Sequence, residues 1–259
     1  MNGGLEAVRE RPRRTLVVMP ALNEEASIAG VLAELRSVAG IQDVLVVDDG
    51  STDATAVVAR AAGATVLELP FNLGVGGAMR AGFLYALRNG YDGVVQVDAD
   101  GQHDPTHIAR LLDRLGEADV VVGSRFAGDG SYRVRGPRRW AMRLLAWAMT
   151  RMCGTRLTDV TSGFRAAGPR ALPVFARHYP PEYLGDTVES LVLARKARLD
   201  VVEEAVVMRP RTAGTPSQSP FRATVYLGRA VLVLILAVVR SAPPAALPGQ
   251  PVGAGAQAE

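Results

Sequence analysis

Residues 43–63 read DVLVVDDGSTDATAVVARAAG. The segment 43–48, apolar from Val44 to Val47, has the length and the β-branched content of a buried strand. Ser51 and Thr52 are residue types that cap helix N-termini, and Gly63 stands where glycines commonly end helices. The stretch therefore predicts a strand, a short polar loop and a helix, which is the repeating unit of a parallel α/β sheet.

The same alternation extends in both directions from this unit. Fully apolar runs of four or five residues predict strands that are buried on both faces, as in a parallel sheet. Segments with apolar side chains at helical spacing lie between them. Strands are expected at 16–20, 64–70, 92–98 and 118–124, and helices at 24–38, 76–90 and 105–116. We predict an α/β fold, a doubly wound and mostly parallel sheet with helices on both faces.

Polar clusters follow four of the predicted strands, and they are Asn23–Glu24, Asp48–Asp49, Asp98–Ala99–Asp100 and Ser124–Arg125. The carboxyl ends of parallel strands share one edge of a sheet, and ligands bind beyond that edge. Asp98 and Asp100, with Gln102 as a further oxygen donor, fit a hard cation such as Mg²⁺ or Mn²⁺ beside a phosphate. The alternative for this stretch is a plain surface turn, because Asp and Gly are turn residues.

Charge is distributed unevenly over the 259 residues. Residues 1–120 contain 10 Arg and 17 acids, whereas residues 121–259 contain 18 Arg, 1 Lys and 9 acids. The basic second half favours an anionic partner, such as a phosphate, a nucleic acid or a membrane surface. A hydrophobic content of 48% excludes global disorder. The single cysteine, Cys153, allows no intrachain disulfide and fits a reducing compartment.

Three motifs in order resemble the family 2 glycosyltransferases. They are Leu16–Glu25 (LVVMPALNEE), Val46–Asp53 (VVDDGSTD) and Asp98–His103 (DADGQH). Gly123–Arg125 and Asp159–Arg165 (DVTSGFR) are similar to the polyprenyl-phosphate branch of that family, which includes the dolichol-phosphate mannose synthases. The resemblance implies a GT-A nucleotide-sugar-binding domain over residues 15–211, inverting chemistry and a divalent metal, Mg²⁺ or Mn²⁺, at the D-x-D motif.

The resemblance also implies roles for single residues. Asp98, Asp100 and Gln102 would hold the metal under the donor diphosphate. Residues expected to contact the nucleotide-sugar donor are Pro20, Leu22, Asn23, Glu24, Asp49, Gly77 and Asp98. The glycines of residues 72–77 would let a helix N-terminus approach the donor phosphate or sugar. The spacing in that loop does not match a dinucleotide-binding loop.

The acceptor decides whether a catalytic base is needed. A phosphate monoester has a second pKa near ~6, so it is already an oxyanion at neutral pH and needs cations rather than a base. Arginine supplies them through forked hydrogen bonds, and the candidates are Arg125, Arg138, Arg139 and Arg165. The branch resemblance therefore implies transfer of a hexose from a nucleotide diphosphate sugar to polyprenyl phosphate, with Asp98, Asp100, Arg125 and Asp186 as catalytic candidates.

The alternative acceptor is a sugar hydroxyl on a cell-envelope glycan or glycolipid. A hydroxyl loses its proton during attack, so a positioned carboxylate is expected. Asp186 could act as that base, although capping of its helix or a contact to the sugar is the favoured interpretation. A helix with Asp186 near its start is expected at 184–199, and a strand is expected within 200–211.

The remaining segments point to a membrane surface. Residues 133–152 predict a basic amphipathic helix with Trp140 and Trp147, and 223–240 predict a strongly apolar helix that contains Arg229. A spanning helix needs about 20 apolar residues, so an interfacial or re-entrant helix is favoured over a span. The tail 241–259 is rich in Pro, Gly and Ala and is expected to be disordered.

These features predict a bacterial protein without a signal peptide, at the cytoplasmic face of the cell membrane. The expected partners are the nucleotide-sugar donor, the polyprenyl phosphate acceptor and the inner membrane surface, with no nucleic acid. The sequence leaves open a separate membrane partner or a homo-oligomer.

Overall fold

The computed structural model describes residues 12–38, 40–41, 43–127, 137–181 and 186–209. Within them the strands are β1 (Thr15–Ala21), β2 (Asp43–Asp48), β3 (Thr65–Glu68), β4 (Gly93–Gln96), β5 (Val120–Ser124), β6 (Arg165–Ala167) and β7 (Val201–Ala205). The helices are α1 (Ile28–Ser37), α2 (Thr55–Ala61), α3 (Gly74–Arg88), η1 (Pro105–His107), α4 (Ile108–Arg114), α5 (Pro137–Cys153), α6 (Ala171–His178) and α7 (Asp186–Lys196).

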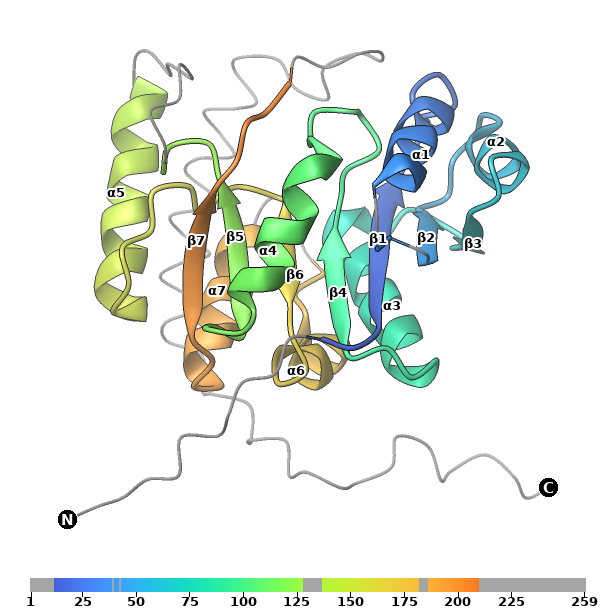
Figure 1. The fold of residues 1–259 in the computed structure, drawn as a ribbon. Helices are drawn as coiled ribbons and strands as arrows, with labels where there is room; N and C mark the ends of the chain where they lie inside the picture. Colours follow the sequence, from blue (N-terminus) through green and yellow to red (C-terminus); the bar gives the residue numbers. More distant parts are fainter. Residues whose placement is uncertain (1–11, 39, 42, 128–136, 182–185, 210–259) are drawn as a thin grey trace.

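The strands form a single seven-stranded sheet in the order β3-β2-β1-β4-β6-β5-β7 (Figure 1). Every pairing is parallel except those of β6, which runs antiparallel to both β4 and β5. The predicted doubly wound, mostly parallel sheet is therefore confirmed. The reversed strand follows from the loop 157–164, because it brings the chain back across the sheet from the carboxyl edge.

A hydrophobic core covers each face of the sheet. One core packs α3, α5, α6 and α7 against side chains such as Val18, Val47 and Val122. The other packs α1 and α4, with Ala59 of α2, against Met19, Val46 and Val121. Successive residues of β1 and β2 thus alternate between the two cores, which explains why these strands are apolar throughout.

Helix boundaries differ from the sequence prediction at their N-termini. Helix α2 begins at Thr55 rather than at residue 51, because the Asp53 carboxylate accepts the N–H of Thr55 (3.0 Å) and that of Glu25 (3.3 Å). Helix α1 begins at Ile28, after a turn closed by Glu24 and Ser27. Strand β6 and helix α6 are not among the elements predicted from the sequence.

Two predicted segments of the second half lie partly or wholly outside the described residues. Helix α5 confirms helical structure from residue 137 of the segment predicted at 133–152. The apolar segment 223–240 and the tail 241–259 both lie outside. None of the helices that the structure describes has the length and apolarity needed to cross a membrane.

Candidate active site

Four motif loops meet at the carboxyl edge of the sheet. Strands β1, β2, β4 and β5 all run in the same direction, so the residues that follow them emerge at one edge. The predicted convergence of the four polar clusters is thereby confirmed. The loop before β6 opens on the same edge, because β6 runs the other way.

The first acid of the D-x-D motif is held from two sides. Asp98 Oδ1 accepts a hydrogen bond from Gln96 Nε2 (3.3 Å), and its Oδ2 lies 3.6 Å from His103 Nε2. The Asp98 side chain remains 38% exposed. A carboxylate fixed in this way, yet open to solvent, fits a group that contacts a bound ligand.

His103 supports the D-x-D loop instead of offering both nitrogens to a ligand. Its Nδ1 accepts the backbone N–H of Asp98 (3.0 Å), so the neutral ring carries its proton on Nε2, which faces Asp98 Oδ2. The ring is 3% exposed and stacks on Phe164, with 4.8 Å between centroids. Phe164 belongs to the loop before β6, so this stack joins the D-x-D loop to the DVTSGFR motif.

Asp100 and Gln102 form a tight turn after Asp98. Asp100 is 7% exposed, and its Oδ1 accepts the backbone N–H of Gln102 (3.0 Å). Among the described residues, no three His, Cys, Asp or Glu side chains converge on one point. Two carboxylates alone fit Mg²⁺ or Mn²⁺ only where substrate phosphates and waters complete the shell, which is how these ions are usually bound beside nucleotides.

The loops after β1 and β2 are joined by hydrogen bonds. Asn23 adopts a positive φ of 55°, and its Oδ1 accepts the N–H of Thr52 (2.8 Å). The Asn23 N–H donates to Ser51 Oγ (2.9 Å), and the Glu24 N–H donates to Thr55 Oγ1 (2.8 Å). The predicted donor residue Asn23 therefore shapes the loop through the side-chain oxygen that would otherwise face a ligand.

Asp49 fixes the start of α3. Its carboxylate is 4% exposed, and Oδ1 accepts the N–H of Leu73 (2.7 Å). Burial raises the pKa of Asp49 above the ordinary 3.8, against the opposing effect of the Leu73 and Gly74 N–H groups. Exposed apolar side chains lie on two other loops at this edge, Leu22 (40%) after β1 and Phe71 (62%) after β3. Pro20 lies within β1, opposite Val47.

The glycines at the start of α3 allow close approach of protein rather than leaving space for a ligand. A Cβ on Gly76 would lie 2.2 Å from the Pro180 carbonyl oxygen and 3.1 Å from the Asp186 Cβ. A Cβ on Gly77 would lie 2.5 Å from the Leu73 Cβ. The surroundings of Gly77 thus give no support to its predicted contact with the nucleotide-sugar donor, because Leu73 occupies the space where a side chain would lie.

Arg125 forms a fork with a fully buried acid. Its Nε donates to Asp159 Oδ2 (2.5 Å) and its Nη2 donates to Asp159 Oδ1 (2.7 Å), with Thr161 Oγ1 a further acceptor (3.2 Å). The Asp159 side chain is 0% exposed and that of Arg125 is 15% exposed. The predicted phosphate-binding cation is therefore held rigidly by the DVTSGFR loop.

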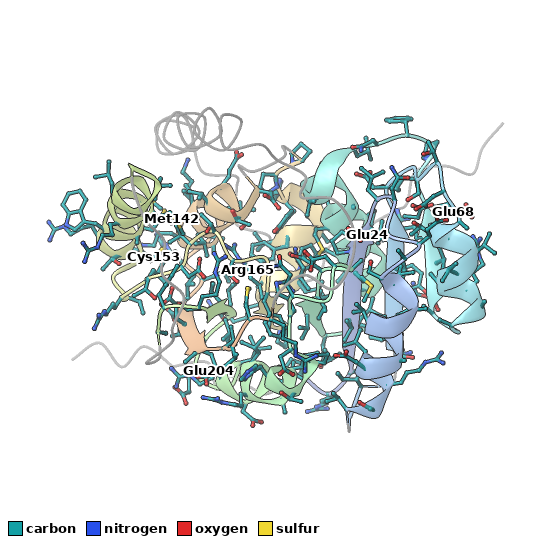
Figure 2. All side chains as sticks on the ribbon, turned by 90° about the horizontal axis from the view of Figure 1, so that it is seen from above. Glu24, Glu68, Met142, Cys153, Arg165 and Glu204 are labelled. Atoms are coloured by element: carbon teal, nitrogen blue, oxygen red, sulfur yellow. The ribbon has the colours of Figure 1, made fainter. Side chains whose placement is uncertain are left out.

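Arg165 is buried and is used inside the protein, which departs from its predicted role. It donates to the carbonyl oxygens of Ser162 (2.7 Å), Thr187 (2.7 Å) and Val160 (2.8 Å), and to Ser190 Oγ (2.8 Å). Four of the five guanidinium N–H groups are thus consumed by neighbours. Figure 2 shows this side chain near the centre of the molecule. Arg165 links the loop before β6 to α7 and is not placed to receive an acceptor phosphate.

The other two predicted phosphate ligands, Arg138 and Arg139, lie in the first turn of α5. Their side chains are outside the described part of the protein. Further along α5, Leu144 is 54% exposed and Trp147 is 63% exposed.

Asp186 is the first residue of α7 and lies next to Gly76 at the start of α3. The side chain is 3% exposed, and among the described groups its Oδ2 has no hydrogen-bond partner. Burial raises the pKa of Asp186 to about 6, although the charge of Arg165 opposes the rise, and the charge of Asp98 adds to it. Burial likewise raises the pKa of Tyr179, with Asp186 as a second cause. Asp186 is therefore close enough to Asp98, the first acid of the D-x-D motif, for their charges to interact.

A sequence profile described as "Glycosyl transferase family 2" matches residues 16–172. This range contains the motif loops described above, and Asp186 lies beyond its end. The chain belongs to glycosyl transferase family 2. An undecaprenyl-phosphate mannosyltransferase from Micrococcus luteus is 40% identical over 162 residues, 59% of this chain and 65% of that protein. A polyprenol monophosphomannose synthase from Mycolicibacterium smegmatis is 34% identical over 174 residues, 64% and 66% of the two chains. The match spans just under two thirds of the length of each relative.

Solved structures give the same fold for this family 2 glycosyltransferase. Glucosyl-3-phosphoglycerate synthase from Mycobacterium tuberculosis, in complex with Mn²⁺, UDP-glucose and phosphoglyceric acid, superposes with a TM-score of 0.67 at 25% identity, over 89% of this chain and 81% of that one. The same enzyme with Mg²⁺ and UDP gives a TM-score of 0.65 at 23% identity, over 87% and 79%. The predicted GT-A fold is confirmed.

The raised pKa of Asp186 predicts a dependence of stability on pH. The folded protein binds the proton of Asp186 more tightly than the unfolded chain does, so the stabilisation is complete below about pH 4 and is lost as the pH rises through about 6. A pKa of about 6 against 3.8 corresponds to about 3 kcal/mol in total. Between pH 5 and pH 7.5, the free energy of unfolding of the wild-type protein should therefore fall, relative to that of Asp186→Asn, by about half of these 3 kcal/mol.

Urea unfolding of both proteins at several pH values measures this difference. A gap between wild type and Asp186→Asn that stays constant over that range would show that Asp186 titrates normally.

Proposed function

We propose that this glycosyltransferase moves a hexose from a nucleotide diphosphate sugar to polyprenyl phosphate at the cytoplasmic face of the membrane. The observation that carries the proposal is the Arg125–Asp159 fork at the edge of the sheet that presents Asp98 and Asp100. A rigid guanidinium at the same edge of the sheet as a pair of carboxylates suits a reaction between two phosphate-bearing substrates. The names of the two relatives support a polyprenyl phosphate acceptor and mannose as one such hexose.

In this mechanism the residues of the chain position the two substrates. Asp98 and Asp100 would hold Mg²⁺ or Mn²⁺, which supplies charge neutralisation for the departing nucleoside diphosphate. Arg125 orients the acceptor phosphate so that one of its oxygens attacks the anomeric carbon from the side opposite the leaving group. That displacement inverts the configuration at the carbon. No proton has to be removed from the acceptor, because its phosphate is ionised at neutral pH.

The donor side of the site is assigned from the loops after β1 and β2. Pro20, Leu22 and Glu24 line the edge next to Asp49, and Leu22 and Phe71 offer apolar surface that suits a nucleobase. Asp49 is assigned to the nucleobase, and its Oδ1 also accepts the N–H of Leu73. The Mn²⁺ and Mg²⁺ complexes of the solved neighbours support a divalent ion in this proposal.

Helix α5 supports a location at the membrane. Its outer side presents Leu144 and Trp147 together with exposed Arg143 and Arg151. Apolar and cationic side chains on one helix surface fit the headgroup region of an anionic bilayer, where indole and guanidinium groups both reside. The proposal is a peripheral or monotopic association, with residues 223–240 as a second contact.

A second candidate function is transfer to a sugar hydroxyl, which Asp186 favours. A buried carboxyl with a pKa of about 6, close to Asp98, has the properties of a general base. The two functions differ in the product. Membranes that contain the protein are incubated with labelled GDP- and UDP-sugars and polyprenyl phosphate, with Mg²⁺ or with a chelator. Label in an organic-extractable, mild-acid-labile product supports the first function, whereas a glycan product that is lost in Asp186→Asn supports the second.

The variant Arg125→Ala tests the role of the fork. Charge-assisted hydrogen bonds contribute about 1.5–3 kcal/mol, so the KM for polyprenyl phosphate should rise about 10- to 100-fold while the KM for the donor stays within about twofold. Arg125→Lys keeps the charge and loses the fork, so it should recover only part of the loss. Initial rates at varied acceptor and at varied donor separate these effects, and an equal loss in both would contradict the assignment.

A further inference from the structure

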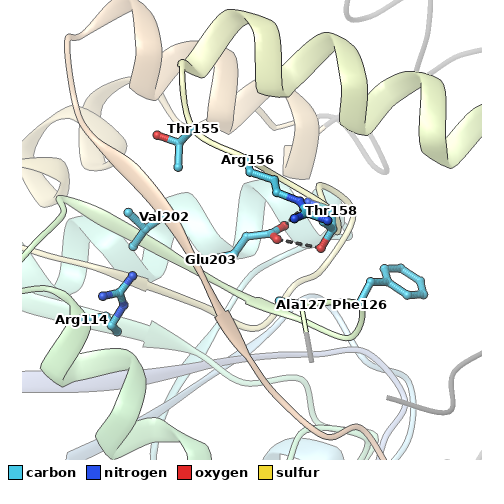
Figure 3. Close-up of a pocket in the computed structure, with 8 residues that line it drawn as sticks. All are labelled: Arg114, Phe126, Ala127, Thr155, Arg156, Thr158, Val202 and Glu203. Carbon is cyan, nitrogen blue, oxygen red and sulfur yellow. Dashed lines mark hydrogen bonds between the residues drawn. The ribbon is translucent and has the colours of Figure 1, made fainter. Parts of the chain in front are cut away.

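Glu203 of β7 makes an unusual set of contacts for a residue on the outermost strand. Its Oε1 accepts two backbone N–H groups, those of Thr158 (2.6 Å) and Asp159 (2.7 Å), and its Oε2 accepts from Thr158 Oγ1 (2.7 Å). Figure 3 shows the contact to Thr158 at the wall of a pocket of about 310 Å³. A single carboxylate thus satisfies two successive backbone donors of the loop before β6.

The neighbouring acid on the same strand points elsewhere. Glu204 forms ion pairs with Arg110 and Arg114 of α4, on the opposite face of the sheet. Figure 2 shows it at the periphery of the molecule beside α4. Adjacent residues of a strand face opposite sides, so Glu203 and Glu204 are a matched pair that differ in what they hold.

The contacts of Glu203 continue to Arg125 in two steps. Asp159, whose N–H binds Glu203, uses both carboxylate oxygens to hold the Arg125 guanidinium. Thr158 Oγ1 also contacts Ser124 Oγ (2.8 Å), the residue before Arg125. The position of the buried Asp159 carboxylate therefore depends on the loop backbone that Glu203 anchors.

We infer that Glu203 is a positioning residue for the acceptor site, because it holds the loop that carries Asp159 and so fixes the guanidinium of Arg125. The inference rests on the proposed function, in which Arg125 binds the acceptor phosphate. In this role Glu203 acts through the loop and makes no contact of its own with a substrate. Its loss would leave two loop N–H groups without their acceptor and would let the Arg125–Asp159 fork move.

The test compares Glu203→Ala, Glu203→Gln and Glu204→Ala in the full-length protein in membranes. Glu203→Ala should raise the KM for polyprenyl phosphate about 10-fold, within the range known for groups that orient a ligand-binding residue, and leave the donor KM within about twofold. The amide oxygen of Gln can accept both N–H groups and its NH₂ can donate to Thr158 Oγ1, so Glu203→Gln should stay within about threefold of wild type. Glu204→Ala removes ion pairs with α4 on the other face of the sheet and none of the contacts described for the loop before β6, so it should leave both constants unchanged.

The double variant Arg125→Ala/Glu203→Ala separates positioning from general loosening of the fold. If Glu203 acts through Arg125, its removal should have no further effect on the acceptor KM once Arg125 is absent. Thr158→Val, which keeps the backbone contacts and removes the hydroxyl, should give a smaller rise than Glu203→Ala and serves as the readout if Glu203→Ala does not fold.

The outcomes distinguish the two proposals. An unchanged acceptor KM in Arg125→Ala would overturn the proposed role of Arg125. A raised acceptor KM in Arg125→Ala, together with an unchanged one in Glu203→Ala, or with additive losses in the double variant, would overturn the inference about Glu203 alone. If Glu203→Ala does not fold, a Thr158→Val protein with an unchanged acceptor KM would have the same meaning.

Discussion

Asp100→Asn should lower the rate of sugar transfer by about 10³-fold while leaving the fold intact. The amide oxygen of Asn can still accept the N–H of Gln102, as Asp100 Oδ1 does now, so the turn after β4 is preserved. The negative charge is lost, and with it a ligand for a hard cation in a site where the described residues supply only two carboxylates. Initial rates at saturating donor and acceptor, with Mn²⁺ titrated, measure the effect.

The matched control lies at the other end of the same strand. Asp92 precedes β4 and accepts the N–H groups of Arg13 (3.0 Å) and Arg14 (2.8 Å), at the edge of the sheet opposite the site. Asp92→Asn should keep the wild-type rate and the wild-type metal requirement. Thermal unfolding of both variants confirms that the comparison is made on folded protein. If Asp100→Asn turned over at the wild-type rate, that result would contradict the assignment of Asp100 as a metal ligand.

Arg165→Met should lower the free energy of unfolding by about 3–5 kcal/mol. The variant keeps much of the side-chain volume, but it leaves the carbonyl oxygens of Val160 and Ser162 without their donor and removes one of the two side-chain donors to the Thr187 carbonyl oxygen. It also removes the cation that opposes the raised pKa of Asp186. Urea unfolding followed by circular dichroism gives the difference directly.

The control for this substitution is an arginine on the surface. Arg60 pairs with Glu68, and both side chains are about half exposed. Arg60→Met should change stability by less than about 0.5 kcal/mol, because exposed ion pairs contribute little. If Arg165→Met were equally mild while its acceptor KM rose sharply, Arg165 would have to be a phosphate ligand after all.

The sequence was sufficient for the central parallel strands because these are apolar on both faces. β2 was predicted at its observed bounds, and β1, β4 and β5 within a few residues, since each is a short apolar run that ends in polar residues. The short β6 was not predictable as an antiparallel strand. It has three residues, one of them an arginine, and its direction is set by pairing with β4 and β5 rather than by its own pattern.

The motifs placed the site at the right edge of the sheet, but they did not reveal what each side chain binds. Asp49 and Asn23 were predicted as donor contacts, yet the structure shows both holding neighbouring loops through contacts 24 to 29 residues away in sequence. The partner of Arg125 is 34 residues distant, and that of Glu203 is 44 to 45 residues distant. Local pattern carries no information about such pairs, because they exist only once the sheet has formed.

The reversed direction of β6 brings two distant stretches of chain together at one edge of the sheet. Residues before 126 supply the D-x-D acids and Arg125, and the return through 157–167 supplies the counter-ion of Arg125 from the opposite chain direction. Phe164 of that return also stacks on His103, so the return loop contacts both parts of the site. A return loop grafted from another member of the family would therefore have to keep the contacts of Asp159 and Phe164 for the two parts to stay in place.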